Sequence, residues 1–504
     1  MMGNDVEPVD DLNRITYPSS LSRLEEVGET IDKDAAPRSP INRLPPELLR
    51  RTFMLGLPDD TSEISNLMAL RAAAPQGRAT LYPPLPPKIT SVCHHWKDIA
   101  LTTPDLWSTL HVELPHSGVF PGGVIELRPS HDIDYASVPI SKAIVDRLSH
   151  SGTRPLRLSV HGLNSSHIHS IVAMKTFGNY SDRWEDVRFY LPFDVVYKYA
   201  TAVGRTPLLT RFILDDDGTY DMPFLSGLFH RDTQAVQIQP LPGLNFLHDA
   251  PLLQHAIVPY SKPGILQLPW AQLTTLLLKR PPSVPLIQIL RQCSNLQNLV
   301  INGYFLKNSG LMTGRLSRLM LQPNTPQNLP GLPVQVPSVR VIHLDCYPAE
   351  TLQYLLFPNL VVLSIVARRN LNEAADFERH ITHSIHWLRL MPSLFRLIIV
   401  GSPDLINDAL LHSLTPSPNE LHTNICPALQ IIEFKDCGSR FTDEALIALL
   451  RSRMRSDRPP NIKRLIWADI SLNRVATFDI EAFRRPFIED GLDLRITCPS
   501  PVPA

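Results

Sequence analysis

Two groups of side chains in this chain of 504 residues are of types that bind metal ions. Cys93 is followed by His94 and His95, which are either metal ligands or a solvent-exposed pair on a helix. The carboxylates of residues 215–217 suit a hard cation, and otherwise form an acidic turn after a strand. A metal site needs further ligands at a recognisable spacing, and the next cysteine is Cys293. We therefore expect no resident metal or cofactor.

Two further groups are thiols and a cluster of positive charge. Cys426 and Cys437 flank an apolar stretch and are most simply buried thiols. Residues 451–464 are rich in arginine, which could contact phosphate or an acidic peptide, or form the solvated end of a helix. The sequence contains no glycine-rich phosphate loop, H-E-x-x-H zinc motif or G-x-S-x-G nucleophile elbow. We therefore expect a protein that is not an enzyme.

Composition also limits the classes of partner. The chain has 48 basic and 49 acidic residues, so its net charge of −1 gives no overall attraction to nucleic acid or anionic lipid. No stretch approaches the roughly 20 apolar residues of a membrane span, and the acidic N-terminus is unlike a signal peptide. Six cysteines without a spacing pattern favour a reducing compartment. We expect a cytoplasmic or nuclear protein that binds neither nucleic acid nor membrane.

An apolar stripe runs along the first of two short segments near the N-terminus, residues 41–53. Pro45 and Pro46 suit the first turn of a helix, where their missing amides cost least, and Glu47 complements the helix dipole. Large apolar side chains then recur at helical spacing: Leu44, Leu48, Leu49 and Phe53.

The second segment, residues 92–110, shows the same helical pattern. Val92, Trp96 and Ile99 fall on one face, and Pro104 then ends the helix. Helices this short cannot bury their stripes alone. We expect the two helices to pack together and to dock on a partner through one apolar surface.

Together the two segments resemble the F-box. The family pattern Leu-Pro-x-Glu-Leu-Leu, followed by Val-Cys-x-x-Trp-x-x-Ile-Ala, is met by Leu44, Pro45, Glu47, Leu48, Leu49, Val92, Cys93, Trp96, Ile99 and Ala100. The continuation at residues 103–107 is similar to the expanded F-box families of mushroom-forming fungi. The resemblance covers residues 40–112. It departs from the family at residues 57–87, an insertion between the halves that we expect to be a surface loop.

The resemblance implies a function and a set of contact residues. It implies a substrate-recognition adaptor of a cullin-based, SCF-type ubiquitin ligase, in which other subunits carry the thioester chemistry. The alternative is an F-box scaffold that acts outside the ligase. The residues implied to bind the Skp-family adaptor, and through it the cullin, are Leu44, Pro45, Leu48, Leu49, Phe53, Val92, Trp96 and Ile99.

A repeat of the form Leu-x-x-Leu-x-Leu fills the rest of the chain. The first intervals after residue 273 lie inside the roughly 20–29 residues typical of leucine-rich repeats, and later intervals leave room for a longer helix. Each unit predicts a strand and a helix, and stacked units share one core. The triplets begin at Trp184, Leu209, Leu253, Leu273, Leu296, Leu316, Val339, Leu360, Leu394, Leu429 and Ile462. We expect a first strand at 156–160 and helices at 140–148, 286–291, 349–356, 380–390 and 443–451.

These patterns predict an α/β fold, an irregular leucine-rich-repeat horseshoe solenoid preceded by a small all-α F-box helical domain. The length exceeds the roughly 250–300 residues at which single cores stop growing, so more than one domain is expected. The predicted organisation is a polar segment at 1–39, the F-box at 40–112, a linker at 113–139, the solenoid at 140–495 and a tail at 496–504.

Residues between the apolar positions of each repeat are expected on the open face of the sheet, because alternate strand residues point to opposite sides. There they would bind a protein substrate, or else pack under neighbouring loops. The predicted set mixes apolar groups with both charges: Asn298, Arg318, His343, Asp345, Val362, Arg396, Ile398, Ile431, Glu433 and Lys435.

Overall fold

The structure is a computed structural model of the chain. Every structural statement below concerns the residues that it describes, which are 44–56, 80–82, 85–114, 139–162, 167–191, 195–196, 204–215, 245–259, 267–279, 283–302, 334–345, 355–366, 385–401, 406–417 and 424–499.

One sheet of fourteen strands, arranged in chain order, runs through the described part of the molecule. Its first two strands pair antiparallel and all later neighbours pair parallel. The strands are β1 (Thr80–Tyr82), β2 (Thr109–Glu113), β3 (Leu156–His161), β4 (Trp184–Tyr190), β5 (Arg211–Leu214), β6 (His255–Pro259), β7 (Thr275–Lys279), β8 (Asn298–Asn302), β10 (Val341–Asp345), β12 (Val362–Val366), β13 (Arg396–Val400), β14 (Ile431–Cys437), β15 (Trp467–Leu472) and β16 (Asp493–Thr497). A separate parallel pair joins β9 (Val334–Gln335) to β11 (Leu355–Leu356).

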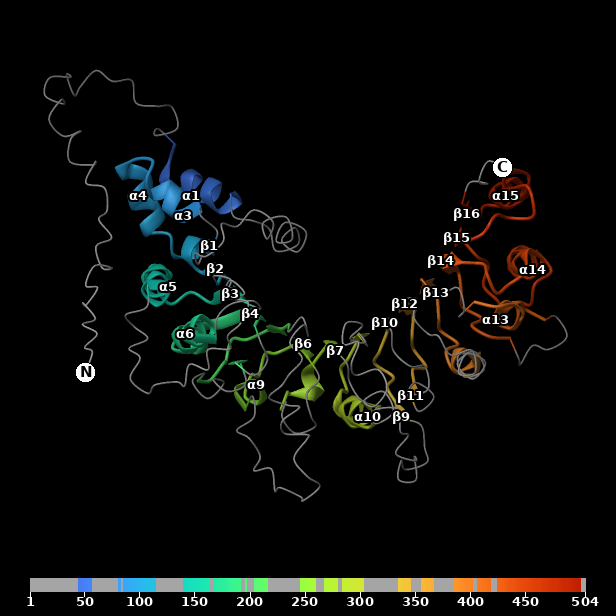
Figure 1. The fold of residues 1–504 in the computed structure, drawn as a ribbon, viewed down its shortest axis with the longest axis horizontal. Coiled ribbons are helices and arrows are strands. Elements are labelled where there is room, and N and C mark those ends of the chain that lie inside the picture. Colours follow the sequence, from blue (N-terminus) through green and yellow to red (C-terminus); the bar gives the residue numbers. More distant parts are fainter. Residues whose placement is uncertain are drawn as a thin grey trace, which may run out of the picture.

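The sheet bends into an open arc, with strands along its inner side and helices along its outer side (Figure 1). Parallel neighbours require such crossover connections, which here carry the helices. The outer helices are α5 (Pro139–Ser149), α6 (His167–Gly178), α9 (Asn245–His248), α10 (Ser283–Gln292), α13 (Asp408–Leu414), α14 (Asp443–Met454) and α15 (Ile480–Glu489). Two 3-10 turns, η4 (Ser181–Arg183) and η6 (Trp270–Gln272), come just before β4 and β7. None of the described helices is long and apolar enough to cross a bilayer. The predicted α/β class, with a large parallel sheet, is confirmed.

The apolar residues of the repeat lie in register across the sheet. Leu299 pairs with Leu276 on one side and with Ile342 on the other, and all three are buried. Because side chains alternate with period two, this register places every such residue on the helix side. One continuous core follows the sheet from Leu110 to Ile496. The triplet that begins at Leu316 lies outside the described residues.

The last triplet, predicted as Ile462-x-x-Leu465-x-Trp467, is wrong by three residues. The pairing of β15 with β14 aligns Ala468 and Ile470 with the core-facing residues of β14, so the triplet is Leu465-x-x-Ala468-x-Ile470. Trp467 lies on the open face and is only half-buried. The sequence pattern favours the bulky Trp467 as a core residue. In the structure Ala468 fills that core position, because a small residue can be close-packed there.

Three predicted helices are confirmed within their bounds: 140–148 in α5, 286–291 in α10 and 443–451 in α14. In the stretch 380–390, residues 385–389 are helical and 380–384 lie outside the described residues. The helix at 349–356 is wrong at its end, because Leu355–Leu356 forms strand β11 and pairs with β9. A strand of two residues carries too little periodicity to be distinguished from a helix end.

The sheet extends beyond the predicted bounds of 140–495 at both ends. Strand β2 belongs to it although it lies within residues 40–112, since Leu110 and Val112 alternate into the core. At the other end β16 continues to Thr497, inside the predicted tail.

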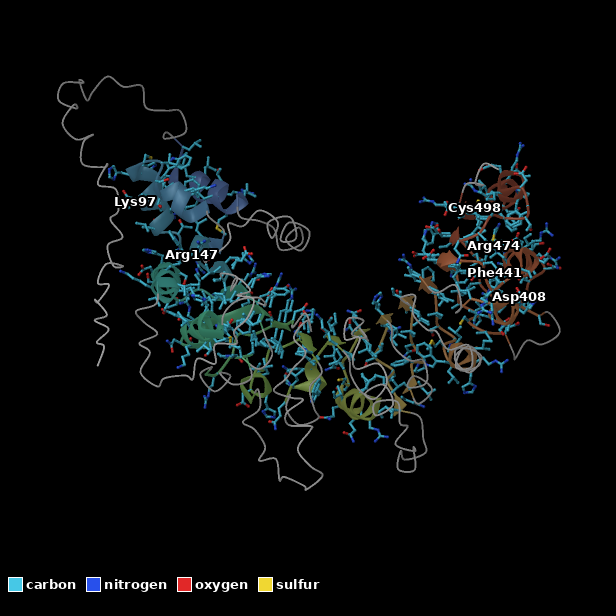
Figure 2. The ribbon with its side chains drawn as sticks, in the orientation of Figure 1. Lys97, Arg147, Asp408, Phe441, Arg474 and Cys498 are labelled. Carbon is cyan, nitrogen blue, oxygen red and sulfur yellow. The ribbon has the colours of Figure 1, made fainter. Side chains whose placement is uncertain are left out.

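The C-terminal end of the arc is held together by Arg474, which lies beside Phe441 (Figure 2). Its guanidinium pairs with the buried carboxylate of Asp443, which also accepts a hydrogen bond from the Thr477 amide at 2.8 Å. Burial alone would raise the pKa of Asp443, but the hydrogen bonds from Arg474 and Thr477 outweigh it and lower that pKa. These contacts fix the turn after β15 to the start of α14.

A small N-terminal helical unit lies at the other end of the arc (Figure 1). We use this name for α1 (Pro46–Leu55) with the two residues before it, α3 (Leu85–Thr90), α4 (His94–Leu101), η2 (Pro104–Trp107) and the short turns between the last three. Its core is separate from that of the sheet and consists of Leu49, Phe53, Ile89, Ile99, Ala100, Leu106 and Trp107.

The predicted surface loop at 57–87 is wrong for its last part. Thr80–Tyr82 forms β1 and pairs antiparallel with β2, so it covers the free edge of the sheet. Leu85 begins α3, which packs against α4. Residues 57–79 lie outside the described part of the chain.

Replacing Thr61–Ala79 with a short Gly-Ser linker is expected to leave the thermal unfolding midpoint nearly unchanged. Each doubling of loop length costs only about 0.6 kcal/mol, so shortening the connection changes little. The matched variant extends the replacement through Tyr82 and should unfold at a clearly lower temperature, because β2 then loses its antiparallel partner. Equal midpoints for the two variants would contradict a structural role of β1.

Candidate functional site

Exposed apolar side chains gather on the N-terminal helical unit. Eleven large apolar residues are exposed in the described part of the chain, and five of them belong to this short unit. Leu48 is 49% exposed and Val92 58%. Such a concentration is typical of an interaction surface, whereas single exposed apolar residues are ordinary. We call this set the apolar patch: Leu44, Leu48, Met54, Leu55 and Val92.

Three residues predicted to contact a partner lie in the core of the unit instead. Leu49, Phe53 and Ile99 are at most 5% exposed, so they cannot touch a partner in this conformation. Trp96 is half-buried, and its ring lies 5.0 Å from that of Phe53. Apolar residues occupy two adjoining faces of α1, and helical spacing alone does not show which face is inside.

The structure shows which residues cap the starts of α1 and α4, which the sequence pattern did not specify. Pro45 is the exposed N-cap of α1, and its carbonyl oxygen accepts hydrogen bonds from Leu48 at 3.0 Å and Leu49 at 3.1 Å. Val92 was predicted within the second helix, but α4 begins at His94. Cys93 is the N-cap, because its sulfur accepts the amide of Trp96 at 3.5 Å.

The possible metal ligands do not converge in the described residues. His94 and His95 lie side by side on α4 and both are exposed. No group of three histidine, cysteine or carboxylate side chains forms a possible metal site within the described ranges. Asp215 forms an ion pair with Lys279 of β7, and residues 216–217 lie outside the described residues.

Trp107 joins the helical unit to the arc. Its indole Nε1 donates to the carbonyl oxygen of Ala100 at 2.8 Å, and its ring lies 4.7 Å from that of His150. The Arg147 guanidinium lies 6.0 Å from the ring centroid, at the junction seen in Figure 2, and burial lowers the pKa of Arg147 to about 10. Asp105 pairs with Arg154 at 3.1 Å. These contacts fix the orientation of the unit relative to α5 and the segment that follows it.

The residues predicted for the open face share three rungs that cross the sheet. Asn298, Val362, Arg396 and Ile431 lie on the first rung, His343, Ile398 and Glu433 on the second, and Asp345 and Lys435 on the third. Those whose side chains are described are half-buried. The side chain of Asp345 and all of Arg318 lie outside the description.

The charges on this face are largely paired with one another. The Arg396 Nε donates to Glu433 at 2.8 Å, and its guanidinium lies 5.9 Å from the ring centroid of Trp467. Lys435 forms an ion pair with Asp469. Pairing between neighbouring strands satisfies these groups, so this part of the face offers its apolar side chains rather than free charge.

Changing Arg396 to Glu is expected to lower the free energy of unfolding by about 1 kcal/mol, because two carboxylates then lie at diagonal positions on neighbouring strands. The double variant Arg396→Glu with Glu433→Arg restores an opposite pair and should recover most of that loss. Urea unfolding of both variants measures the effect, and Arg389→Glu, at an exposed site, is the control. If the double variant is no more stable than the single one, the pair contributes nothing.

A second charged group lies near the N-terminal end of the face. Asp186 accepts hydrogen bonds from Arg188 at 2.9 Å and Arg211 at 3.0 Å, and Asp186 and Arg188 are both buried. Burial lowers the pKa of His255 on the next strand, and the positive charge of Arg211 lowers it further. This network satisfies its own charges and shows no reactive nucleophile.

The buried thiols are poor nucleophiles. Burial raises the pKa of Cys293, Cys426 and Cys437 to about 12, so they stay protonated near neutral pH. The expectation that Cys426 and Cys437 are core thiols is confirmed by their burial.

Two arginines of the basic run at 451–464 are held within the local fold, whereas Arg451, Arg455 and Lys463 are exposed. Arg453 is fully buried, and its guanidinium donates to the carbonyl oxygens of Leu414 at 3.0 Å, Ile425 at 2.9 Å and Cys426 at 3.3 Å. The Arg458 Nε donates to the carbonyl of Ile462 at 3.1 Å. Both side chains therefore hold the local fold and are not available for phosphate.

A groove of about 700 Å³ lies where β6, β7, β8 and β10 begin, and sequence reasoning missed it. Four of its residues directly follow the first apolar residue of a repeat and are polar: Gln254, Thr274, Gln297 and Arg340. In the next two repeats the same position holds Val361 and Phe395. That change from polar to apolar was the available signal in the sequence.

Comparison with known proteins adds no relative. No family model matches this chain, and no curated protein matches it.

Proposed function

We propose that this chain is the substrate-recognition adaptor of a cullin-based ubiquitin ligase. In this proposal the N-terminal helical unit is an F-box that docks on a Skp-family adaptor, and the arc is an irregular leucine-rich-repeat solenoid that holds a protein substrate. The observation that carries the proposal is the apolar patch on a unit whose core is already complete without it. A unit that has its own core gains nothing for folding from five exposed apolar residues, so they serve binding.

The arrangement of the arc supports the second half of the proposal. The strands lie in chain order and the helices labelled in Figure 1 lie along the outer side of the arc, so no described helix covers the inner face of the sheet. Such surfaces are typical of repeat proteins that bind other proteins. The open face carries half-buried apolar residues such as Val300, Ile398 and Ile431 between ion pairs.

The proposed contribution to the reaction is proximity. The chain would hold a lysine of the substrate near a thioester carried by another subunit, and such positioning supplies much of the rate of a bimolecular step. The contacts of Trp107 with Arg147 and His150 make the distance between the two binding surfaces well defined. In this proposal the protein itself is not an enzyme, and it acts in the cytoplasm or nucleus.

Affinity purification of the full-length chain from cells, followed by identification of a Skp-family adaptor and a cullin, tests the proposal. We expect both proteins in near-stoichiometric amounts. Adaptor without cullin would favour the alternative, an F-box scaffold outside the ligase. Absence of the adaptor would overturn the assignment of the helical unit.

A further inference from the structure

The groove at the start of β6, β7, β8 and β10 is lined by one row of four residues, one from each strand, whose main chains are linked by hydrogen bonds. The amide of Thr274 donates to the carbonyl of Gln254 at 2.9 Å, Gln297 to Thr274 at 2.8 Å and Arg340 to Gln297 at 2.8 Å. This row continues the sheet by one residue before each strand. Its side chains are therefore held at the spacing of the strands.

The side chains of this row can form hydrogen bonds with the main chain of a polypeptide. Gln254, Gln297 and Arg340 are exposed. Each glutamine amide can donate and accept hydrogen bonds, whereas the Thr274 hydroxyl already donates to the carbonyl of Gln254 at 3.2 Å and can still accept one. The groove therefore offers donors and acceptors to the alternating N–H and C=O groups of an extended chain. The next residue in this row after Arg340 is Val361, which is apolar, so the row of polar side chains ends there.

The two ends of the groove differ in chemistry. At one end Leu252 is 47% exposed beside Pro251. The turn that presents it is fixed by Gln272, whose amide donates to the carbonyls of Ala250 at 2.7 Å and Leu253 at 3.1 Å. At the other end Arg340 forms no ion pair with any described residue, and no described carboxylate lines the groove.

We propose that this groove binds an extended polypeptide segment that carries an apolar side chain on Leu252 and a carboxylate on Arg340. Neighbouring strands lie about 4.8 Å apart, so the three steps from Gln254 to Arg340 cover about 14 Å, or about four extended residues. A single arginine pairs with a carboxylate in two hydrogen bonds. Nucleic acid would need several cations for its phosphates, and the groove has one.

This inference rests on the proposed function, because the bound segment would belong to the protein held for ubiquitin transfer. The carboxylate could belong to an aspartate or glutamate side chain or to the end of a chain. The groove chemistry is the same for both, and the experiment separates them. Peptide binding to the groove needs no adaptor. Failure of peptide binding and failure to capture the adaptor are therefore separate results.

The probe is a set of synthetic peptides in which one leucine and one carboxylate are separated by one to eight residues of glycine, serine and threonine. In one arm the carboxylate is a glutamate within an amidated peptide, and in the other it is the free C-terminus. Calorimetry with the full-length chain measures binding. We expect the tightest binding at a separation of three to five residues, and about tenfold weaker binding when glutamine replaces glutamate.

Variants of the chain show whether the groove is responsible. Arg340→Ala should remove the preference for glutamate over glutamine, Arg340→Glu should favour peptides with lysine at that place, and Leu252→Ser should weaken all of them. Arg291→Ala, at an exposed site in the last turn of α10, is the matched control and should bind as the unchanged chain does. Equal binding of glutamate and glutamine peptides, or an undiminished preference in Arg340→Ala, would overturn the proposal.

Discussion

Changing Leu48 and Val92 together to Asp is expected to abolish capture of a purified Skp-family adaptor. Both side chains are about half exposed or more, and both belong to the apolar patch. A few apolar anchors carry most of the energy of an interface, and a carboxylate buried against apolar groups is costly. We expect the dissociation constant to rise on the order of 100-fold or more. Pull-down and calorimetry with the full-length chain measure the loss.

The control for this prediction is Ile488→Asp. Ile488 is 49% exposed, as Leu48 is, but it lies on α15 at the opposite end of the arc. Both proteins should unfold at the same temperature as the unchanged chain, because surface substitutions usually cost no more than about 0.5 kcal/mol. Trp96 is a poorer probe, since its contact with Phe53 ties it to the core. Capture retained by the folded double variant would exclude the apolar patch as the docking surface.

Changing Arg453 to Met is expected to cause the largest loss of stability. The guanidinium donates to three buried carbonyl oxygens, and methionine fills the space without a donor. Each buried carbonyl left without a partner costs about 1–3 kcal/mol, so we expect a loss of about 3 kcal/mol or more in the free energy of unfolding. Burial lowers the pKa of Arg453 to about 10, so the group still carries its charge at neutral pH.

Arg451→Met is the matched control for Arg453. It removes the same charge from the same helix, but at an exposed position, and should change stability by no more than about 0.5 kcal/mol. Arg453→Lys should lie between the two, because an ammonium group cannot reach three carbonyls in the planar geometry of a guanidinium. Urea unfolding of the three proteins gives the comparison. If Arg453→Met unfolds like Arg451→Met, the buried hydrogen bonds add no net stability.

The sequence alone determined the repeat and most of the residues that face the core. Leu276, Leu299 and Ile342 were assigned correctly, because burial on one side of a strand leaves a local pattern with period two. The two N-terminal helices were also predicted, since their apolar residues recur at helical spacing. Ala468 was missed because a small residue in a core carries no such signal.

Only the tertiary structure decided which of several similar residues face the core. Leu48 and Leu49 are neighbours with the same chemistry, yet one is half exposed and the other fully buried. The sequence places Arg453 within a basic run, as if it were a surface residue, but two segments far from it in sequence, at Leu414 and at residues 425–426, supply its partners. The groove likewise joins Gln254 to Arg340 through strand pairing. Local patterns record preferences of single elements, whereas burial, pairing and grooves depend on which distant segments come into contact.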